Sequence, residues 1–152
     1  MTHPILTPLS RIWAQIRPPT RKQAAALCWR EGSNGIEVLL ITTRRTGRWT
    51  PPKGGLGRNT PHVAARMEAE EEAGAFGEIS DQVAGTYRTM KLRKKGYWAK
   101  LSVAVYPMRV DRMEDEYLEK GQRKLEWFAP SDAARRVREP ELRRLLREFK
   151  PV

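Results

Sequence analysis

A loop that leads directly into a helix constrains the fold of this 152-residue chain more than any other segment. Residues 45–61 read RTGRWTPPKGGLGRNTP, and this content of glycine and proline argues against a regular element. Thr60 suits the N-cap of a helix and Pro61 its first position, while Gly74 is placed to end it. The sequence therefore predicts a helix over 61–73 whose first turn follows a loop rich in glycine and cations.

Apolar, partly β-branched runs on both sides of this helix predict strands. The first two runs, QAAALCW and IEVLLITTR, flank the loop REGSNG and are expected to pair antiparallel. Two longer strands after the helix are expected to be joined by a turn at Lys94, Lys95 and Gly96. The predicted strands cover residues 23–29, 36–44, 78–92, 97–110 and 124–129.

Two further helices are predicted near the C-terminus. Ser131 is expected to cap a short helix. Residues 139–149 are expected to form the last helix. In the last helix an apolar stripe at helical spacing opposes a face rich in arginine; the stripe consists of Leu142, Leu145, Leu146 and Phe149. Strands before and after a central helix indicate one mixed α/β domain over residues 1–152.

Charge and composition narrow the classes of partner. The chain has 29 Lys and Arg against 18 Asp and Glu, a net charge of +11, which favours nucleic acid, polyphosphate compounds or anionic membranes as partners. No apolar run reaches the ~18 residues that a membrane span needs. Cys28 is the single cysteine, which excludes an internal disulfide and favours a cytoplasmic location. Residues 1–20 are interpreted as an N-terminal extension with a short docking helix.

Four glutamates in five positions contrast with this basic composition. On a helix, Glu68, Glu71 and Glu72 share one face, whereas Glu70 points well away from it. Carboxylates crowded on one face raise each other's pKa, and a cation among them relieves the repulsion. Oxygen ligands suit Mg²⁺ or Mn²⁺. The alternative is an exposed acidic patch that balances nearby arginine and lysine.

The loop and the glutamate helix together resemble the Nudix box, whose pattern is G-x5-E-x7-R-E-U-x-E-E-x-G-U, with U an aliphatic residue. The chain matches it at Glu68, Glu71, Glu72 and Gly74, with alanine at both aliphatic positions. Met67 and Asn59 stand where the family has arginine and glutamate. In the family these two side chains pair with each other, so their joint loss removes an ion pair without leaving a lone charge.

The resemblance continues outside the box, over about residues 20–149. The segments VLLITTRRTGRWTPPKG and GQRKLEWFAP resemble the bacterial subgroup similar to diphosphoinositol-polyphosphate and dinucleoside-polyphosphate hydrolases. The resemblance implies a Nudix-type α/β/α sandwich with a central mixed sheet. It also implies metal-dependent hydrolysis of a pyrophosphate linkage, with Glu68, Glu71 and Glu72 as metal ligands and catalytic residues. The carbonyl of Gly54 or Gly55 is a further implied ligand.

A phosphorylated substrate needs cationic contacts, and the loop before the helix supplies them. Arg44, Arg45, Arg48 and Lys53 are the predicted phosphate contacts. A second cluster on the predicted hairpin is interpreted mainly as surface cations; it consists of Lys91, Arg93, Lys94 and Lys95.

Two hypotheses for function follow. The first is an enzyme that uses Mg²⁺ or Mn²⁺ on a diadenosine polyphosphate or an inositol pyrophosphate. The alternative is a protein of the same fold that is catalytically weak or inactive and binds nucleic acid or a nucleotide ligand. The replacements at Met67 and Asn59 and the excess of arginine favour the alternative, and the three glutamates favour the enzyme.

Overall fold

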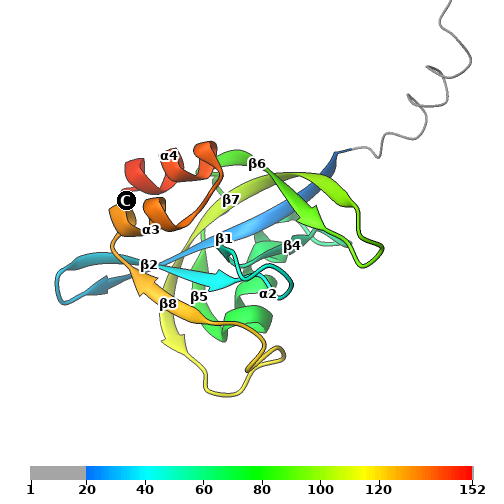
Figure 1. The fold of residues 1–152 in the computed structure, drawn as a ribbon. Coiled ribbons are helices and arrows are strands. Elements are labelled where there is room, and N and C mark those ends of the chain that lie inside the picture. The colour runs from blue at the N-terminus through cyan, green and yellow to red at the C-terminus, as the bar shows by residue number, and fades with distance from the viewer. Residues whose placement is uncertain (1–19, 152) are drawn as a thin grey trace, which may run out of the picture.

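The computed structural model describes residues 20–151, and these form one sheet covered by helices on both faces (Figure 1). The predicted docking helix lies outside the described residues. The helices are α2 (Pro61–Ala73), α3 (Pro130–Arg136) and α4 (Pro140–Glu148). The strands are β1 (Arg21–Gly32), β2 (Gly35–Thr42), β3 (Trp49–Thr50), β4 (Lys53–Gly55), β5 (Ala75–Ile79), β6 (Gly85–Leu92), β7 (Trp98–Met113) and β8 (Leu125–Phe128).

The sheet is mixed and is built around the two longest strands. Its main path runs β3-β2-β1-β7-β5, with β4 paired to β1, β6 to β7 and β8 to β2. The β1–β7 pair is parallel, with Arg21 opposite Leu101 and Trp29 opposite Arg109. The other pairs are antiparallel, including the predicted β1–β2 and β6–β7 hairpins. The predicted mixed sheet is therefore confirmed.

Strand β1 separates two hydrophobic cores because its side chains alternate between the faces of the sheet. Ala24, Ala26 and Cys28 belong to the core under α2. Ala25 and Leu27 belong to the other core, under α3 and α4. Figure 1 shows α2 on one side of the sheet and α3 with α4 on the other. The expectation of a Nudix-type α/β/α sandwich is confirmed.

Helix α2 packs closely on the sheet because its inner face is made of alanine. Ala64, Ala65, Ala69 and Ala73 are buried, with exposed fractions of 3% or less. Gly74 adopts φ 66° and ends the helix as predicted. Thr60 takes the predicted N-cap position, although its side chain makes no capping hydrogen bond. This close approach brings Glu68 and Glu72 of the helix next to β4.

The predicted strand over 78–92 is wrong, because the structure divides it. Strand β5 ends at Ile79 and β6 begins at Gly85, although both pair with β7. Ser80 explains the interruption: its hydroxyl accepts a hydrogen bond from the Gln82 N–H at 3.1 Å. This local turn competes with the strand ladder.

Two smaller predictions are also wrong. The segment 45–61 was expected to lack regular elements, but it contains the short strands β3 and β4. Strand β4 forms by pairing with β1, which brings Gly54 opposite Ala24. Helix α3 begins at Pro130, so Ala129 rather than Ser131 is its N-cap. Proline favours the first helical position because it has no N–H to satisfy there.

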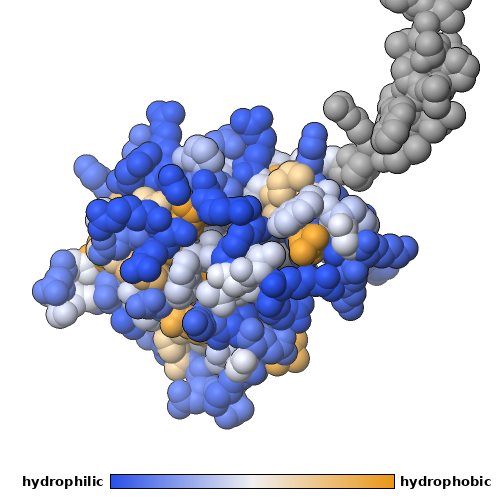
Figure 2. All heavy atoms as spheres, in the orientation of Figure 1, coloured by the Kyte–Doolittle hydropathy of each residue, from blue (hydrophilic) through white to orange (hydrophobic). Residues whose placement is uncertain are grey.

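The last helix agrees with its predicted amphipathic pattern. Leu142 and Leu146 are buried, and Leu145 and Phe149 pack against the same core. The arginines of α3, of α4 and of the segment between them are exposed; they are Arg135, Arg136, Arg138, Arg143, Arg144 and Arg147. Figure 2 shows hydrophilic residues over most of the face it presents. In the described part of the chain, no helix is long and apolar enough to cross a membrane.

Gly77 provides a test of this sheet. A Cβ at this position in β5 would overlap the backbone carbonyl of Arg109 in β7. We therefore expect Gly77→Ala to lower the free energy of unfolding by about 1–3 kcal/mol, the usual cost of overpacking. Gly55→Ala is the matched control, because no atom lies within 4 Å of its added Cβ. Urea denaturation of both variants checks this, and equal stability of the two would contradict the β5–β7 packing.

Candidate active site

The loop before α2 is held directly against the glutamate helix. The N–H of Lys53 donates a hydrogen bond to Oε1 of Glu72 at 2.9 Å. Gly54 follows, and a side chain there would overlap the carboxylate of Glu68. The hydrogen bond and this close approach place the backbone of β4 beside two of the three predicted metal ligands.

A buried ion pair forms the centre of the site. Nη2 of Arg123 lies 2.6 Å from Oε2 of Glu72, and the two side chains are only 9% and 7% exposed. The same nitrogen lies 3.2 Å from Oε1 of Glu119. Nη1 of Arg123 donates to the carbonyl of Thr42 at 3.1 Å. One guanidinium therefore joins helix α2 to the end of β2 and to the loop before β8.

The loop between β7 and β8 covers the C-terminal end of α2. The N–H of Glu119 donates to the carbonyl of Glu71 at 2.9 Å, and that of Glu114 to the carbonyl of Gly74 at 2.8 Å. These bonds bring Glu119 beside the three predicted glutamates as a fourth carboxylate. Sequence reasoning missed both Glu119 and Arg123. Their distance along the chain from α2 gave no spacing signal that links them to it.

The carboxylates share one electrostatic environment. Burial raises the pKa of Glu68 from 4.5 to about 7, and the charges of Glu72, Glu71 and Glu119 add to this rise. Burial also raises the pKa of Glu72 to about 7, against the opposing effects of Arg123 and the Lys53 N–H. A cation placed among these oxygens would stabilise their charged forms. The donor set of carboxylates and backbone carbonyls suits Mg²⁺ or Mn²⁺.

The predicted ligands are gathered but not closed around one point. Within residues 20–151, no three side chains of Asp, Glu, His or Cys converge closely enough to hold a metal ion. The geometry gives a reason, because both oxygens of Glu72 already have partners, the Lys53 N–H and Arg123. Glu68 and Glu71 are half-buried on the same side of α2. The metal site stays a prediction whose donor chemistry fits.

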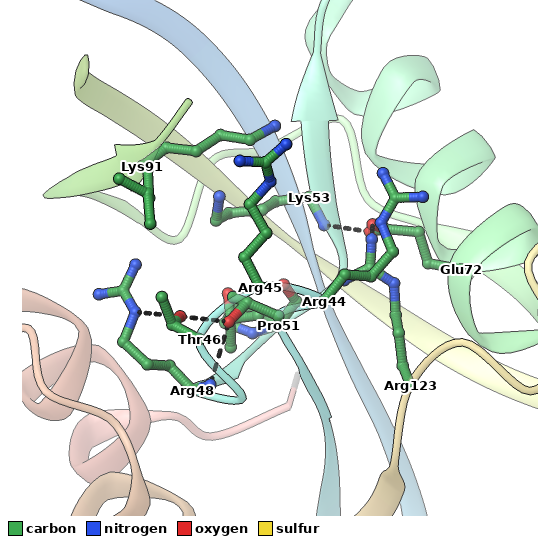
Figure 3. Close-up of a pocket in the computed structure, with 12 residues that line it drawn as sticks. Arg44, Arg45, Thr46, Arg48, Pro51, Lys53, Glu72, Lys91 and Arg123 are labelled. Atoms are coloured by element: carbon green, nitrogen blue, oxygen red, sulfur yellow. Dashed lines mark hydrogen bonds and ion pairs between the residues drawn. The ribbon is translucent and has the colours of Figure 1, made fainter. Parts of the chain in front are cut away.

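The predicted phosphate contacts line one cavity next to the carboxylates. Its volume is about 110 Å³, and its wall includes Glu72 and Arg123 (Figure 3). All four predicted cations contribute to the wall, and Lys91 joins them from β6. These cations are Arg44, Arg45, Arg48 and Lys53. The sequence had placed Lys91 among surface cations, because the hairpin pairing that turns β6 toward the loop is not visible in its composition.

Several of these cations are fixed by the fold. Arg48 donates to the carbonyl of Met90 at 2.8 Å, and Arg44 donates to Oε1 of Gln122 at 2.9 Å. Burial lowers the pKa of Lys53 to about 8, and the charge of Lys91 adds to this effect. Burial likewise lowers the pKa of Lys91, with Arg93 contributing. Positive charge is thus concentrated in a cavity where an anion would restore the ordinary pKa values.

A second cavity of about 320 Å³ adjoins the first and shares Arg44, Arg45 and Lys91 with it. The tip of the β6–β7 hairpin supplies the rest of its charge and one aromatic ring; these residues are Arg93, Lys94, Lys95 and Tyr97. Trp98 is 43% exposed, and the Arg48 guanidinium carbon lies 5.8 Å from its ring centre. Trp49 instead packs edge-on against Phe128. The two cavities form one cation-lined surface that ends at the carboxylates.

Comparison with known proteins identifies the family. The NUDIX domain model matches residues 20–149. The chain belongs to the Nudix family. The match begins with the first described residue and reaches the end of α4, so it includes both helical layers and the whole sheet.

Named relatives of this Nudix chain are phosphohydrolases. Diphosphoinositol polyphosphate phosphohydrolase 3-beta of Homo sapiens is 30% identical over 116 residues, which are 74% of this chain and 66% of the relative. Diphosphoinositol polyphosphate phosphohydrolase 2 of Rattus norvegicus is 28% identical over 116 residues, 74% of this chain and 60% of the relative. The chain thus spans less than two thirds of the length of these relatives.

Solved structures show the same fold. An Ap4A hydrolase of C. elegans superposes with a TM-score of 0.61 at 21% identity, covering 86% of this chain and 96% of that one. The dihydroneopterin triphosphate pyrophosphohydrolase of E. coli gives a TM-score of 0.63 at 14% identity, covering 86% and 97%. At these identities the likeness shows the fold alone.

The raised pKa of Glu68 predicts how stability depends on pH without metal. A carboxyl whose pKa rises from 4.5 to about 7 on folding favours the folded state below pH 4.5, and this contribution is lost as the pH rises to about 7. In EDTA above pH 7, we expect Glu68→Gln to increase the free energy of unfolding by about 1–2 kcal/mol, after discounting for solvent screening. Urea denaturation at pH 4 and pH 8 measures the difference.

Glu70→Gln is the control for this measurement. Its carboxylate lies on the other side of α2 and pairs with Arg66, so the substitution should give no gain at pH 8. A Glu68→Gln variant that is as stable as wild type at pH 8 would show that the Glu68 charge is well solvated.

Proposed function

We propose that this Nudix chain is a metal-dependent hydrolase of a pyrophosphate linkage in a highly phosphorylated small molecule. One observation carries the proposal: a cavity lined by six basic side chains has the buried carboxylate of Glu72 in its wall. Five of them are Arg44, Arg45, Arg48, Lys53 and Lys91, and the sixth is Arg123, which is paired with Glu72. Anion-binding and cation-binding groups therefore meet at one place. A phosphate chain lying in the cavity would present its oxygens to both.

The residues have separate roles in this proposal. Glu68, Glu71 and Glu72 would hold Mg²⁺ or Mn²⁺ together with the carbonyl of Gly54, and Glu119 is a further oxygen donor nearby. Bound metal supplies charge neutralisation and a water of lowered pKa for in-line attack at phosphorus. The cations of the loop hold and orient the phosphates. The bond between Lys53 and Glu72 keeps these two sets of groups in register.

The substrate class follows from charge and cavity shape. The second cavity extends the cation-lined surface beyond the first, which favours a substrate that carries several phosphates besides the cleaved linkage. A diadenosine polyphosphate or an inositol pyrophosphate meets this requirement, and the names of the relatives agree with it. A net charge of +11 supports the same class. The buried free thiol of Cys28 is consistent with a cytoplasmic location.

A second candidate function is binding without turnover. Two observations favour it: Met67 and Asn59 replace two box residues, and Arg123 already neutralises Glu72. In that case the cation-lined cavities, together with the exposed arginines of α3 and α4, would bind a nucleotide or nucleic acid. The two candidates differ in whether the glutamates of α2 are needed.

Hydrolysis of a panel of compounds, with the phosphorylated products separated and identified by ion-exchange chromatography, tests the proposal. The panel contains diadenosine polyphosphates, inositol pyrophosphates, nucleoside triphosphates, nucleotide sugars and 5′-triphosphate RNA, each with Mg²⁺, Mn²⁺ or EDTA. We expect turnover that needs metal and falls by about 100-fold or more in Glu71→Gln, because a charged metal ligand is lost. Glu70→Gln makes the same change one residue away and should keep at least half of the activity.

No turnover with any compound and metal would contradict the proposal. Binding of a polyanion that is the same in wild type and Glu71→Gln would then favour the second candidate.

The cavity wall gives a prediction for substrate affinity. Lys91→Ala removes a cation from the wall shared by both cavities. We expect KM for the preferred substrate to rise about tenfold, as for one charge-assisted hydrogen bond, with a smaller change in kcat. Arg147→Ala removes the same charge from the exposed side of α4 and should leave KM unchanged. Steady-state kinetics of both variants at one ionic strength measure this difference. Equal KM values for Lys91→Ala and Arg147→Ala would show that Lys91 does not contact the substrate.

A further inference from the structure

Arg123 lies where a divalent cation would be expected to bind. Its Nη2 contacts Glu72 at 2.6 Å and Glu119 at 3.2 Å, so one guanidinium nitrogen lies between two carboxylates. Both side chains of the Glu72 pair are more than nine-tenths buried. Figure 3 shows Arg123 reaching Glu72 along the wall of the cavity that also contains Lys53.

We propose that Arg123 is a resident cation that competes with divalent metal for Glu72, and that metal binding displaces its guanidinium from this carboxylate. The proposal rests on the metal dependence proposed above. Glu72 has two oxygens, of which Oε1 accepts the Lys53 N–H and Oε2 contacts Arg123. A metal ion bound to Oε2 would lie next to the guanidinium nitrogen that is 2.6 Å from the same atom, and the two cations would repel each other.

The other contacts of Arg123 make such a displacement feasible. After losing Glu72, Nη2 keeps Glu119, and Nη1 keeps the carbonyl of Thr42. The Nε group is buried and has no hydrogen-bond partner among the described residues. An unsatisfied buried donor favours any rearrangement that supplies it with an acceptor. Arg123 therefore has anchors that keep it in the cavity wall and a donor that gains from movement.

Competition accounts for the incomplete convergence of the carboxylates. A guanidinium is larger than Mg²⁺ and holds Glu72 by a hydrogen-bonded ion pair, so the oxygens around it need not approach one point. Without Arg123 the four neighbouring carboxylates of the site would repel each other at neutral pH. Arg123 thereby stabilises the metal-free protein and at the same time weakens metal binding.

Metal binding alone tests the proposal, without any substrate. Calorimetric titration with Mn²⁺ is compared for wild type, Arg123→Met, Arg123→Lys and Arg44→Met. We expect Arg123→Met to bind Mn²⁺ about tenfold more tightly or better, because the competing cation is gone. Arg123→Lys, which retains a charge without the planar fork, should lie between the two. Arg44→Met removes a nearby charge that lies 3.6 Å from Glu119. Between the described residues Arg44 and Glu72 there is no ion pair, and this variant should change Kd by less than threefold.

The outcomes are distinguishable. Mn²⁺ affinity that is unchanged or weaker in Arg123→Met, or raised no more than in Arg44→Met, overturns the competition but leaves a metal-dependent enzyme possible. Absence of Mn²⁺ binding in wild type and all three variants overturns the competition and the proposed function together.

Arg123→Met could fail to fold, because loss of one partner of a buried ion pair is strongly destabilising. A measurement on the wild-type protein therefore tests the same proposal. The Nε–H resonance of Arg123, assigned by its absence in Arg123→Lys, is followed by NMR during Mg²⁺ titration. We expect it to shift with the same midpoint as the calorimetric titration of the wild type with Mg²⁺. A resonance that stays unchanged while Mg²⁺ stabilises the protein would overturn the proposal.

Discussion

The buried carboxylate of Glu72 is the interaction on which the site depends. One of its oxygens accepts a hydrogen bond from the Lys53 N–H, and the other forms an ion pair with Arg123. Through these contacts helix α2 is joined to β4 and to the loop before β8, which are distant in sequence. Removing charges from water is costly, and such a pair persists only where its geometry is close and its remaining groups are bonded. The alanine face of α2 makes this possible by bringing the helix close to the sheet.

The site places a group of carboxylates directly beside a group of basic side chains. The protein has a net charge of +11, yet it buries the carboxylate of Glu72 and half-buries that of Glu68. Burial raises the pKa of both, and the charges of neighbouring carboxylates add to the rise. Cations line the cavity beside them, where burial lowers the pKa values of Lys53 and Lys91 and the neighbouring positive charges lower them further. Each set is unfavourable alone, and a phosphate chain with a divalent cation would relieve both. This arrangement connects the fold of the family to the chemistry we propose.

The parts of the fold that sequence predicted are those encoded locally. The helix over 61–73 has its start at Thr60 and Pro61 and its stop at Gly74, and the amphipathic pattern of α4 defines its own buried face. The break between β5 and β6 was missed because it depends on a hydrogen bond within a serine turn. Strands β3 and β4 were missed because their identity comes from pairing with β2 and β1 rather than from their glycine-rich and proline-rich sequence.

In the site, too, residues close together in the sequence were predicted and residues brought in by long-range packing were missed. The glutamates and the loop cations are close in sequence, and their spacing showed that they could meet. Arg123, Glu119 and Lys91 enter the site through long-range packing, and their local sequence is that of ordinary surface charges.

The most direct test of the proposed metal site and of the Arg123 displacement is anomalous diffraction from crystals grown with Mn²⁺. We expect a manganese peak bounded by Glu68, Glu71 and Glu72, with Arg123 moved away from Glu72. Manganese bound elsewhere, or no peak with the Arg123–Glu72 pair intact, would contradict this expectation.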